Sequence, residues 1–124
     1  MEINLPEVVA EVTEAFLKYQ DAVDTNNVGV MNALFWNSSH TVRFGPNGTL
    51  ISHAAIAAFR QGRPGGGTKR ILQNTVITTF GRDFAATNTE STKPGRPGVS
   101  RQSQCWIRTS EGWRIAAAHV SDQP

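Results

Sequence analysis

The stretch that decides the fold is residues 101–121, which read RQSQCWIRTSEGWRIAAAHVS. Two long runs of strand-like composition flank a short Glu-Gly turn at 111–112, a pattern typical of a β-hairpin. In an unbroken second strand, His119 would share one face with Trp113 and Ile115, because side chains in a strand repeat every two residues. A histidine among aromatic and aliphatic residues on one face favours a concave sheet that lines a pocket.

Helical patterns come before this hairpin, and further strands lead up to it. We expect helices at 6–24, at 28–35 and after the capping residue Ser52, short strands at 41–44 and 49–51, and long strands at 70–81, 84–92 and in the hairpin. The chain of 124 residues is long enough for one domain, so we expect a single domain over 1–124. Helices followed by antiparallel strands predict an α+β fold with helices on one face of a curved sheet.

The composition argues against several classes of protein. Hydrophobic residues make up 39% of the chain and charged residues 18%, and the formal net charge is only +2, as in an ordinary globular protein. No Lys/Arg-rich run suggests nucleic-acid binding, and no apolar run suggests a membrane span. Cys105 is the only cysteine, so no disulfide framework is expected. These features predict a cytoplasmic protein.

Arginines are numerous after the first helix, which is itself rich in acidic residues. They stand at Arg43, Arg60, Arg63, Arg70, Arg82, Arg96, Arg101, Arg108 and Arg114. The planar guanidinium suits bidentate binding of a carboxylate, so a small anionic ligand is one interpretation. The other is that these are solvated surface side chains, and for most positions we prefer it.

The familiar motifs of cofactor, metal and nucleophilic chemistry do not fit this sequence. The Gly-rich segment at 62–69 lacks the Gly-Lys-Thr order of a phosphate loop and follows a helix, so a mobile loop is expected. No Gly-x-Ser-x-Gly elbow occurs. His40, His53 and His119 are scattered and have no cysteine partner, which argues against zinc. We therefore expect no metal and no cofactor.

Two residues are candidates for a chemical role. Tyr19 lies on an apolar helical stripe with Val12 and Phe16, where a buried phenol needs a hydrogen-bond partner and beside a cation could transfer a proton. The other interpretation is a core tyrosine whose hydroxyl reaches backbone or solvent, and from the residues alone we prefer it. Arg43 alternates with Val42 and Phe44 in a short strand, so it faces either solvent or a cavity in which it would hold an anion.

Other side chains are candidates for the wall of a pocket. Arg60 and Arg63 continue the inward spacing of Ile56 and Phe59 toward a pocket rim, although arginines there often only snorkel. His119 could donate, accept or merely fill space. Trp36 is mainly a packing candidate that could also cover a pocket.

The order of elements resembles a known superfamily. Helix–helix–strand–strand–helix, followed by long strands ending in the 112–115 and 119–121 runs, is similar to the ketosteroid-isomerase-like, nuclear-transport-factor-like proteins. The resemblance implies a cone-shaped roll, in which a bent antiparallel sheet wraps around a long N-terminal helix with two further short helices. Members range from isomerases to binding modules, so the fold alone does not determine activity. Cone folds often pair through the sheet, which implies a homodimer or higher homo-oligomer with Trp106 or Ile107 at the contact.

A narrower resemblance is to the AtzH-like decarboxylating amidohydrolases associated with oxalurate and cyanuric acid catabolism. It is carried by the segments 3–8, 35–36, 41–43, 59–60, 63–64, 75–79 and 81–85. The cyanuric acid branch converts 1,3-dicarboxyurea into allophanate, and the subgroup is linked to amidase-family enzymes, so an amidase-family pathway partner is implied.

This resemblance implies roles for individual residues. The subgroup's helix tyrosine corresponds to Tyr19 and its strand arginine to Arg43, which implies that both are catalytic. Arg63, His119 and Trp36 would then bind the substrate, a small N-carboxylated urea. No residue stands out as an activator of water, so direct decarboxylation is as consistent as hydrolysis. A non-catalytic binding or accessory subunit for an amidase remains the alternative.

Overall fold

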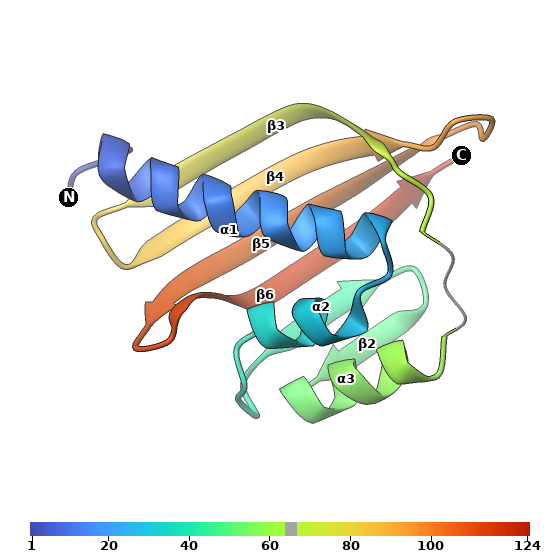
Figure 1. The fold of residues 1–124 in the computed structure, drawn as a ribbon, viewed down its shortest axis with the longest axis horizontal. Helices are drawn as coiled ribbons and strands as arrows, with labels where there is room; N and C mark the ends of the chain where they lie inside the picture. Colours follow the sequence, from blue (N-terminus) through green and yellow to red (C-terminus); the bar gives the residue numbers. More distant parts are fainter. Residues whose placement is uncertain (64–66) are drawn as a thin grey trace.

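The computed structural model describes residues 1–63 and 67–124 and contains helices α1–α3 and strands β1–β6 (Figure 1). Their bounds are α1 Pro6–Asp24, α2 Val28–Leu34, β1 Val42–Gly45, β2 Gly48–Ile51, α3 His53–Gln61, β3 Ile71–Phe80, β4 Phe84–Thr92, β5 Val99–Thr109 and β6 Gly112–Gln123. These elements lie where the sequence predicts them, and the second helix ends one residue earlier than expected, at Leu34.

The six strands form one bent sheet in the order β2-β1-β6-β5-β4-β3. All neighbouring pairs are antiparallel except β1 and β6, which run parallel. Figure 1 shows α1 lying across one face of the long strands, with α2 and α3 beside its C-terminal end. The predicted α+β architecture, with helices on one face of a curved sheet, is confirmed. None of the described helices combines the length and apolar character needed to cross a membrane.

Helix α1 buries one apolar stripe against the sheet. Pro6 occupies the first turn, where its missing N–H costs no hydrogen bond. Val8, Val12 and Phe16 follow at helical spacing and are buried, whereas Leu17 on the opposite face is 54% exposed. The stripe continues to Tyr19, so the same helix that forms the core also carries a candidate functional group toward its C-terminal end.

Trp106 is the largest fully buried side chain and lies inside the cone. Its Nε1 donates to Thr87 Oγ1 at 3.0 Å, and that hydroxyl donates to Gln104 Oε1 at 3.2 Å. A buried indole therefore has its polar group satisfied. The expectation that Trp106 contributes to a subunit contact is wrong, because this residue faces the core. Ile107 follows it and alternates to the outer face, and self-association itself stays a prediction.

A bulge in β6 reverses the expected orientation of His119. Trp106 pairs with Ile115 and Cys105 with Ala117, which leaves Ala116 without a partner. Alternation is interrupted there, so Ala118 is buried and His119 is exposed. The His119 ring lies 6.0 Å from the ring of Phe44, which is also exposed. The prediction that His119 faces the pocket with Trp113 and Ile115 is wrong, because it assumed an unbroken strand.

Replacing Trp106 with alanine should test the core. We expect Trp106→Ala to lower the free energy of unfolding by about 3–5 kcal/mol, because it leaves a cavity and removes the partner of Thr87. Leu17→Ala is the control and should change stability by less than about 0.5 kcal/mol. Urea denaturation followed by circular dichroism measures both. Similar losses in the two variants would contradict the assigned core.

Candidate functional site

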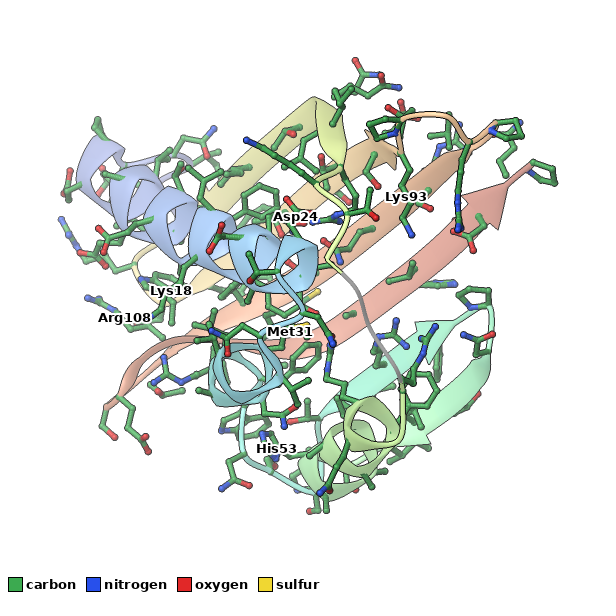
Figure 2. The ribbon with its side chains drawn as sticks, turned by 45° about the vertical axis from the view of Figure 1, so that its right-hand side comes forward. Lys18, Asp24, Met31, His53, Lys93 and Arg108 are labelled. Atoms are coloured by element: carbon green, nitrogen blue, oxygen red, sulfur yellow. The ribbon has the colours of Figure 1, made fainter. Side chains whose placement is uncertain are left out.

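A cleft lies at the C-terminal end of α1, between this helix, α2, α3 and the sheet. Its volume is about 360 Å³, and its described lining consists of Tyr19, Val23, Asn26, Met31, Arg43, Phe59, Arg60, Arg63, Arg70, Lys93, Gln102 and Val120. In Figure 2, Asp24 marks the end of α1, Met31 lies on α2 below it, and Lys93 lies at the end of β4. The titratable side chains of this lining are one tyrosine and five cations, so the cleft suits an anion.

The structure brings three of the five predicted site residues together. Tyr19, Arg43 and Arg63 all line the cleft, although they come from α1, β1 and the segment that follows α3. His119 lies on the outer face of the sheet, as described above. Trp36 lines a separate depression of about 530 Å³ with His53 and Arg114, and stacks on His40 at 6.4 Å. The proposed substrate contacts of His119 and Trp36 are therefore not supported by their positions.

Tyr19 has a fixed environment. Its side chain is 2% exposed, and its ring meets the edge of the Phe35 ring at a centroid distance of 5.7 Å. The hydroxyl oxygen accepts a hydrogen bond of 2.7 Å from Nη2 of Arg60. Because Arg60 comes from α3, this bond joins the third helix to the first. The phenol is therefore held at the cleft by a cation.

Arg43 enters the cleft because of its register in β1. It pairs with Ala118 of β6, whose small side chain leaves space above the sheet, and its guanidinium lies 5.7 Å from the Phe59 ring centroid. Burial lowers the pKa of Arg43 below its ordinary value; Tyr19 acts in the opposite direction, and the charges of Arg60 and Arg63 lower the pKa further. The alternative in which Arg43 faces solvent is excluded by this placement.

Three arginines of the cleft have no acidic partner among the described residues. Within residues 1–63 and 67–124, neither Arg43, Arg60 nor Arg63 forms a salt bridge. The Arg63 guanidinium, two residues beyond the end of α3, lies 5.0 Å from the Phe59 ring centroid, where the sequence predicts the rim of a pocket. Cations held on aromatic rings without a carboxylate would gain most from a bound anion.

Arg70 differs from these three arginines because its charge is paired. Its Nε donates to Asp24 Oδ1 at 2.6 Å, and the two side chains are only 9% and 17% exposed. Its Nη2 donates to Gln20 Oε1 at 2.8 Å, and Gln20 Nε2 donates to Gln102 Oε1 at 2.6 Å. This polar wall ties α1 to β3 and β5. It forms part of the lining of the cleft.

Sequence reasoning missed part of this site. Arg60 was predicted only as a rim residue, although it follows Ile56 at the same helical spacing at which Arg63 follows Phe59. The Gln20–Gln102 bond joins residues that are 82 positions apart, so no local pattern could indicate it. Asp24 was expected only to end the helix, and its bond with Arg70 likewise depends on the folded arrangement.

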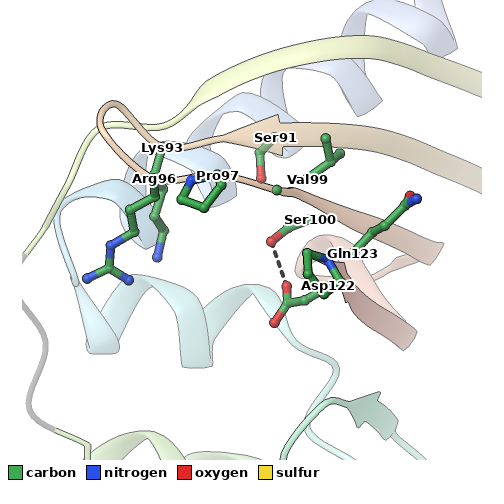
Figure 3. Close-up of a pocket in the computed structure, with 10 residues that line it drawn as sticks. Ser91, Lys93, Arg96, Pro97, Val99, Ser100, Asp122 and Gln123 are labelled. Carbon is green, nitrogen blue, oxygen red and sulfur yellow. Dashed lines mark hydrogen bonds between the residues drawn. The ribbon is translucent and has the colours of Figure 1, made fainter.

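A second depression shares Lys93 with the cleft. This shallow depression is lined by Lys93, Arg96 and Asp122, and Ser100 Oγ donates to Asp122 Oδ1 at 2.6 Å (Figure 3). The prediction of a mobile loop at 62–69 falls partly on residues 64–66, which lie outside the described residues.

The side chains that line the cleft do not indicate a metal-binding site. In the described part of the chain, no group of three or more His, Cys, Asp or Glu side chains could hold a metal ion. The lining side chains of the cleft are mostly hydrogen-bond donors, whereas metals need lone-pair donors. The arrangement is suited to binding carboxylates.

Removing the Arg43 charge should stabilise the empty protein. At low salt we expect Arg43→Met to raise Tm by about 3 °C, because burial of this charge and its repulsion from Arg60 and Arg63 both disfavour it in the folded state. A lowered pKa means that the unfolded chain binds this proton more tightly. The charge therefore costs stability at every pH below both pKa values, and the gain should be equal at about pH 6 and pH 8.

Differential scanning calorimetry of Arg43→Met should show the gain shrinking at high salt, which screens charges over about 8–10 Å. Arg108→Met is the control, because Arg108 is paired with Asp83 at 3.0 Å and should give no gain. A lower Tm for Arg43→Met at low salt would contradict uncompensated charge in the cleft.

Comparison with known proteins supports the fold and identifies the family. The AtzH-like family model matches residues 1–124. A protein of unknown function from Pectobacterium atrosepticum is 46% identical over 98% of this chain and 95% of its own, with a TM-score of 0.94. A cystatin-like fold protein from Burkholderia xenovorans is 44% identical over 100% and 99%, with a TM-score of 0.92.

More distant structures share the architecture. A nuclear transport factor 2-like superfamily protein from Salmonella enterica is 25% identical over 95% of this chain and 92% of its own, with a TM-score of 0.73. No curated protein matches the sequence. The match over the full length of the chain, together with the cystatin-like cone, shows that this protein belongs to the AtzH-like family.

Proposed function

We propose that this protein is a cofactor-free enzyme that removes one carboxyl group from 1,3-dicarboxyurea to give allophanate. The observation that carries the proposal is the cleft in which Arg43 and Arg63 lie beside Tyr19 without a carboxylate partner among the described residues. A urea with a carboxylate at each end needs two cationic anchors and one proton donor. Membership of the AtzH-like family supports the same substrate class.

The proposed roles follow from position. Arg43, on the sheet and near Tyr19, would hold the near carboxylate and keep the carbamoyl group in plane. Arg63 is exposed at the end of α3 and would hold the far carboxylate. Tyr19 would give its proton to the nitrogen that leaves. Arginine suits both anchoring roles because it stays charged when partly buried.

The lining of the cleft favours direct decarboxylation over hydrolysis. Its described titratable side chains are Tyr19 and cations, and a cation is a poor general base for water. In the proposed step the C–N bond breaks and its electron pair stays on nitrogen, which takes the proton of Tyr19. The products are carbon dioxide and allophanate, and the tyrosinate recovers a proton from water.

Turnover should be tested with freshly generated 1,3-dicarboxyurea. We expect allophanate to form faster than in the spontaneous reaction, and Tyr19→Phe to lower kcat by about 10²-fold or more. Arg43→Ala should lower kcat/KM by about 10²-fold, because the near carboxylate loses its anchor. His119→Ala, on the outer face, should leave kcat and KM unchanged. Full activity in both Tyr19→Phe and Arg43→Ala would contradict the proposed site.

The first product distinguishes the two chemical routes. Direct decarboxylation releases carbon dioxide, so a carbon dioxide electrode should record an overshoot that added carbonic anhydrase removes. Hydrolysis would release bicarbonate and give no overshoot. Binding of the substrate without any acceleration would instead identify a non-catalytic subunit that serves an amidase-family partner.

A further inference from the structure

Arg60 determines in which direction Tyr19 can exchange its proton. A guanidinium has only donors, so in the 2.7 Å bond between Arg60 Nη2 and the Tyr19 hydroxyl the phenol oxygen must be the acceptor. The proton of the phenol must therefore point elsewhere. Within the described residues the hydroxyl has no acceptor of its own, and Tyr19 lines the cleft, so a bound ligand is the partner that this proton can reach.

The Arg60 side chain is held firmly enough to impose this direction. Its Nη1 donates to Met31 Sδ at 2.9 Å. Its guanidinium carbon lies 5.8 Å from the ring centroid of Tyr19 and 5.2 Å from that of Phe35. Packing between two rings and bonding at both terminal nitrogens restrict its rotation, so the donor is in place before a ligand arrives.

The environment of Arg60 also indicates the role of its hydrogen bond to Tyr19. Its Nε is buried and has no hydrogen-bond partner among the described residues. The position of this side chain therefore does not satisfy all of its own hydrogen-bond donors. A cation that donates into the phenol oxygen stabilises the negative charge that develops there as the proton leaves. The same contact makes this oxygen a poor acceptor for a proton.

We propose that Arg60 is the positioning residue that commits Tyr19 to donating its proton to the ligand in the cleft. The catalytic part of this inference rests on the proposed decarboxylation. There the O–H bond of Tyr19 breaks, a new N–H bond forms on the substrate, and Arg60 stays bonded to the resulting tyrosinate. Arg60 itself need not touch the substrate.

The kinetic test separates positioning from substrate binding. Arg60→Met should lower kcat by about 10²-fold while KM changes by less than about threefold, and Arg60→Lys should recover part of kcat because it retains a cationic donor. In a Tyr19→Phe background, Arg60→Met should have almost no further effect. Equal losses in both backgrounds, or a change confined to KM, would overturn the proposal.

A second readout does not depend on turnover. Tyr19 is the only tyrosine of the chain, so protein labelled at the tyrosine ring carbon that bears the hydroxyl gives one NMR resonance. Arg60→Met should shift this resonance in the free protein, whereas Arg63→Met should not, because Arg63 lies on Phe59 and makes no bond to Tyr19. Added glutarate, an unreactive dicarboxylate with the same chain length as 1,3-dicarboxyurea, should shift the wild-type resonance further.

The kinetic test and the NMR comparison can fail independently of each other. If the wild-type protein does not turn over 1,3-dicarboxyurea, the proposed function is wrong, but the NMR comparison still tests the contact between Arg60 and Tyr19. If Arg60→Met leaves the free resonance unchanged, this inference is wrong even in an active enzyme. Thermal unfolding verifies that each variant is folded. If Arg60→Met is not, Arg60→Gln replaces it in the NMR comparison, because glutamine also removes the cation and should likewise shift the resonance.

Discussion

Helix α1 changes character along its length, and the rest of the structure depends on how it packs. Its first three turns bury Val8, Val12 and Phe16 in the cone, where apolar contacts fix the helix on the sheet. The last turns carry Tyr19 and Gln20, which are also buried but need polar partners. Packing of the apolar half therefore places the polar half at the open end, where a cleft forms.

The arginines that line the cleft differ in whether their charge is paired within the protein. Arg70 is satisfied by Asp24 and Gln20, so it contributes shape and rigidity. Arg43 and Arg63 lie on the Phe59 ring without a carboxylate partner in the described parts of the chain, and we expect this arrangement to cost stability until an anion binds. Such a site sacrifices some folding free energy for ligand binding, as functional sites commonly do.

The order and type of the elements could be predicted because each depends on local signals. Pro6 marks the start of α1, and Ser52 caps α3 by accepting from Ala55 N at 3.1 Å. The position of His119 could not be predicted, because a bulge at Ala116 depends on how β5 and β6 pair rather than on composition.

The candidate site, like the fold, could be predicted only where it depends on local sequence signals. Helical periodicity placed Tyr19 on the apolar stripe of the first helix. Strand periodicity left open whether Arg43 faces solvent or a cavity, and only the family resemblance implied a catalytic role for both residues. The bond from Arg60 to Tyr19 spans 41 positions, and only the folded chain shows which of the many arginines reaches the phenol.

The most direct test of a carboxylate-binding cleft is calorimetric titration of the protein with glutarate and with butyrate, which carries a single carboxylate. The account predicts saturable glutarate binding at one site, weakened by salt, and butyrate binding that is weaker by about tenfold or more because only one anchor is used. Equal affinities for the two acids, or no glutarate binding at low salt, would contradict it.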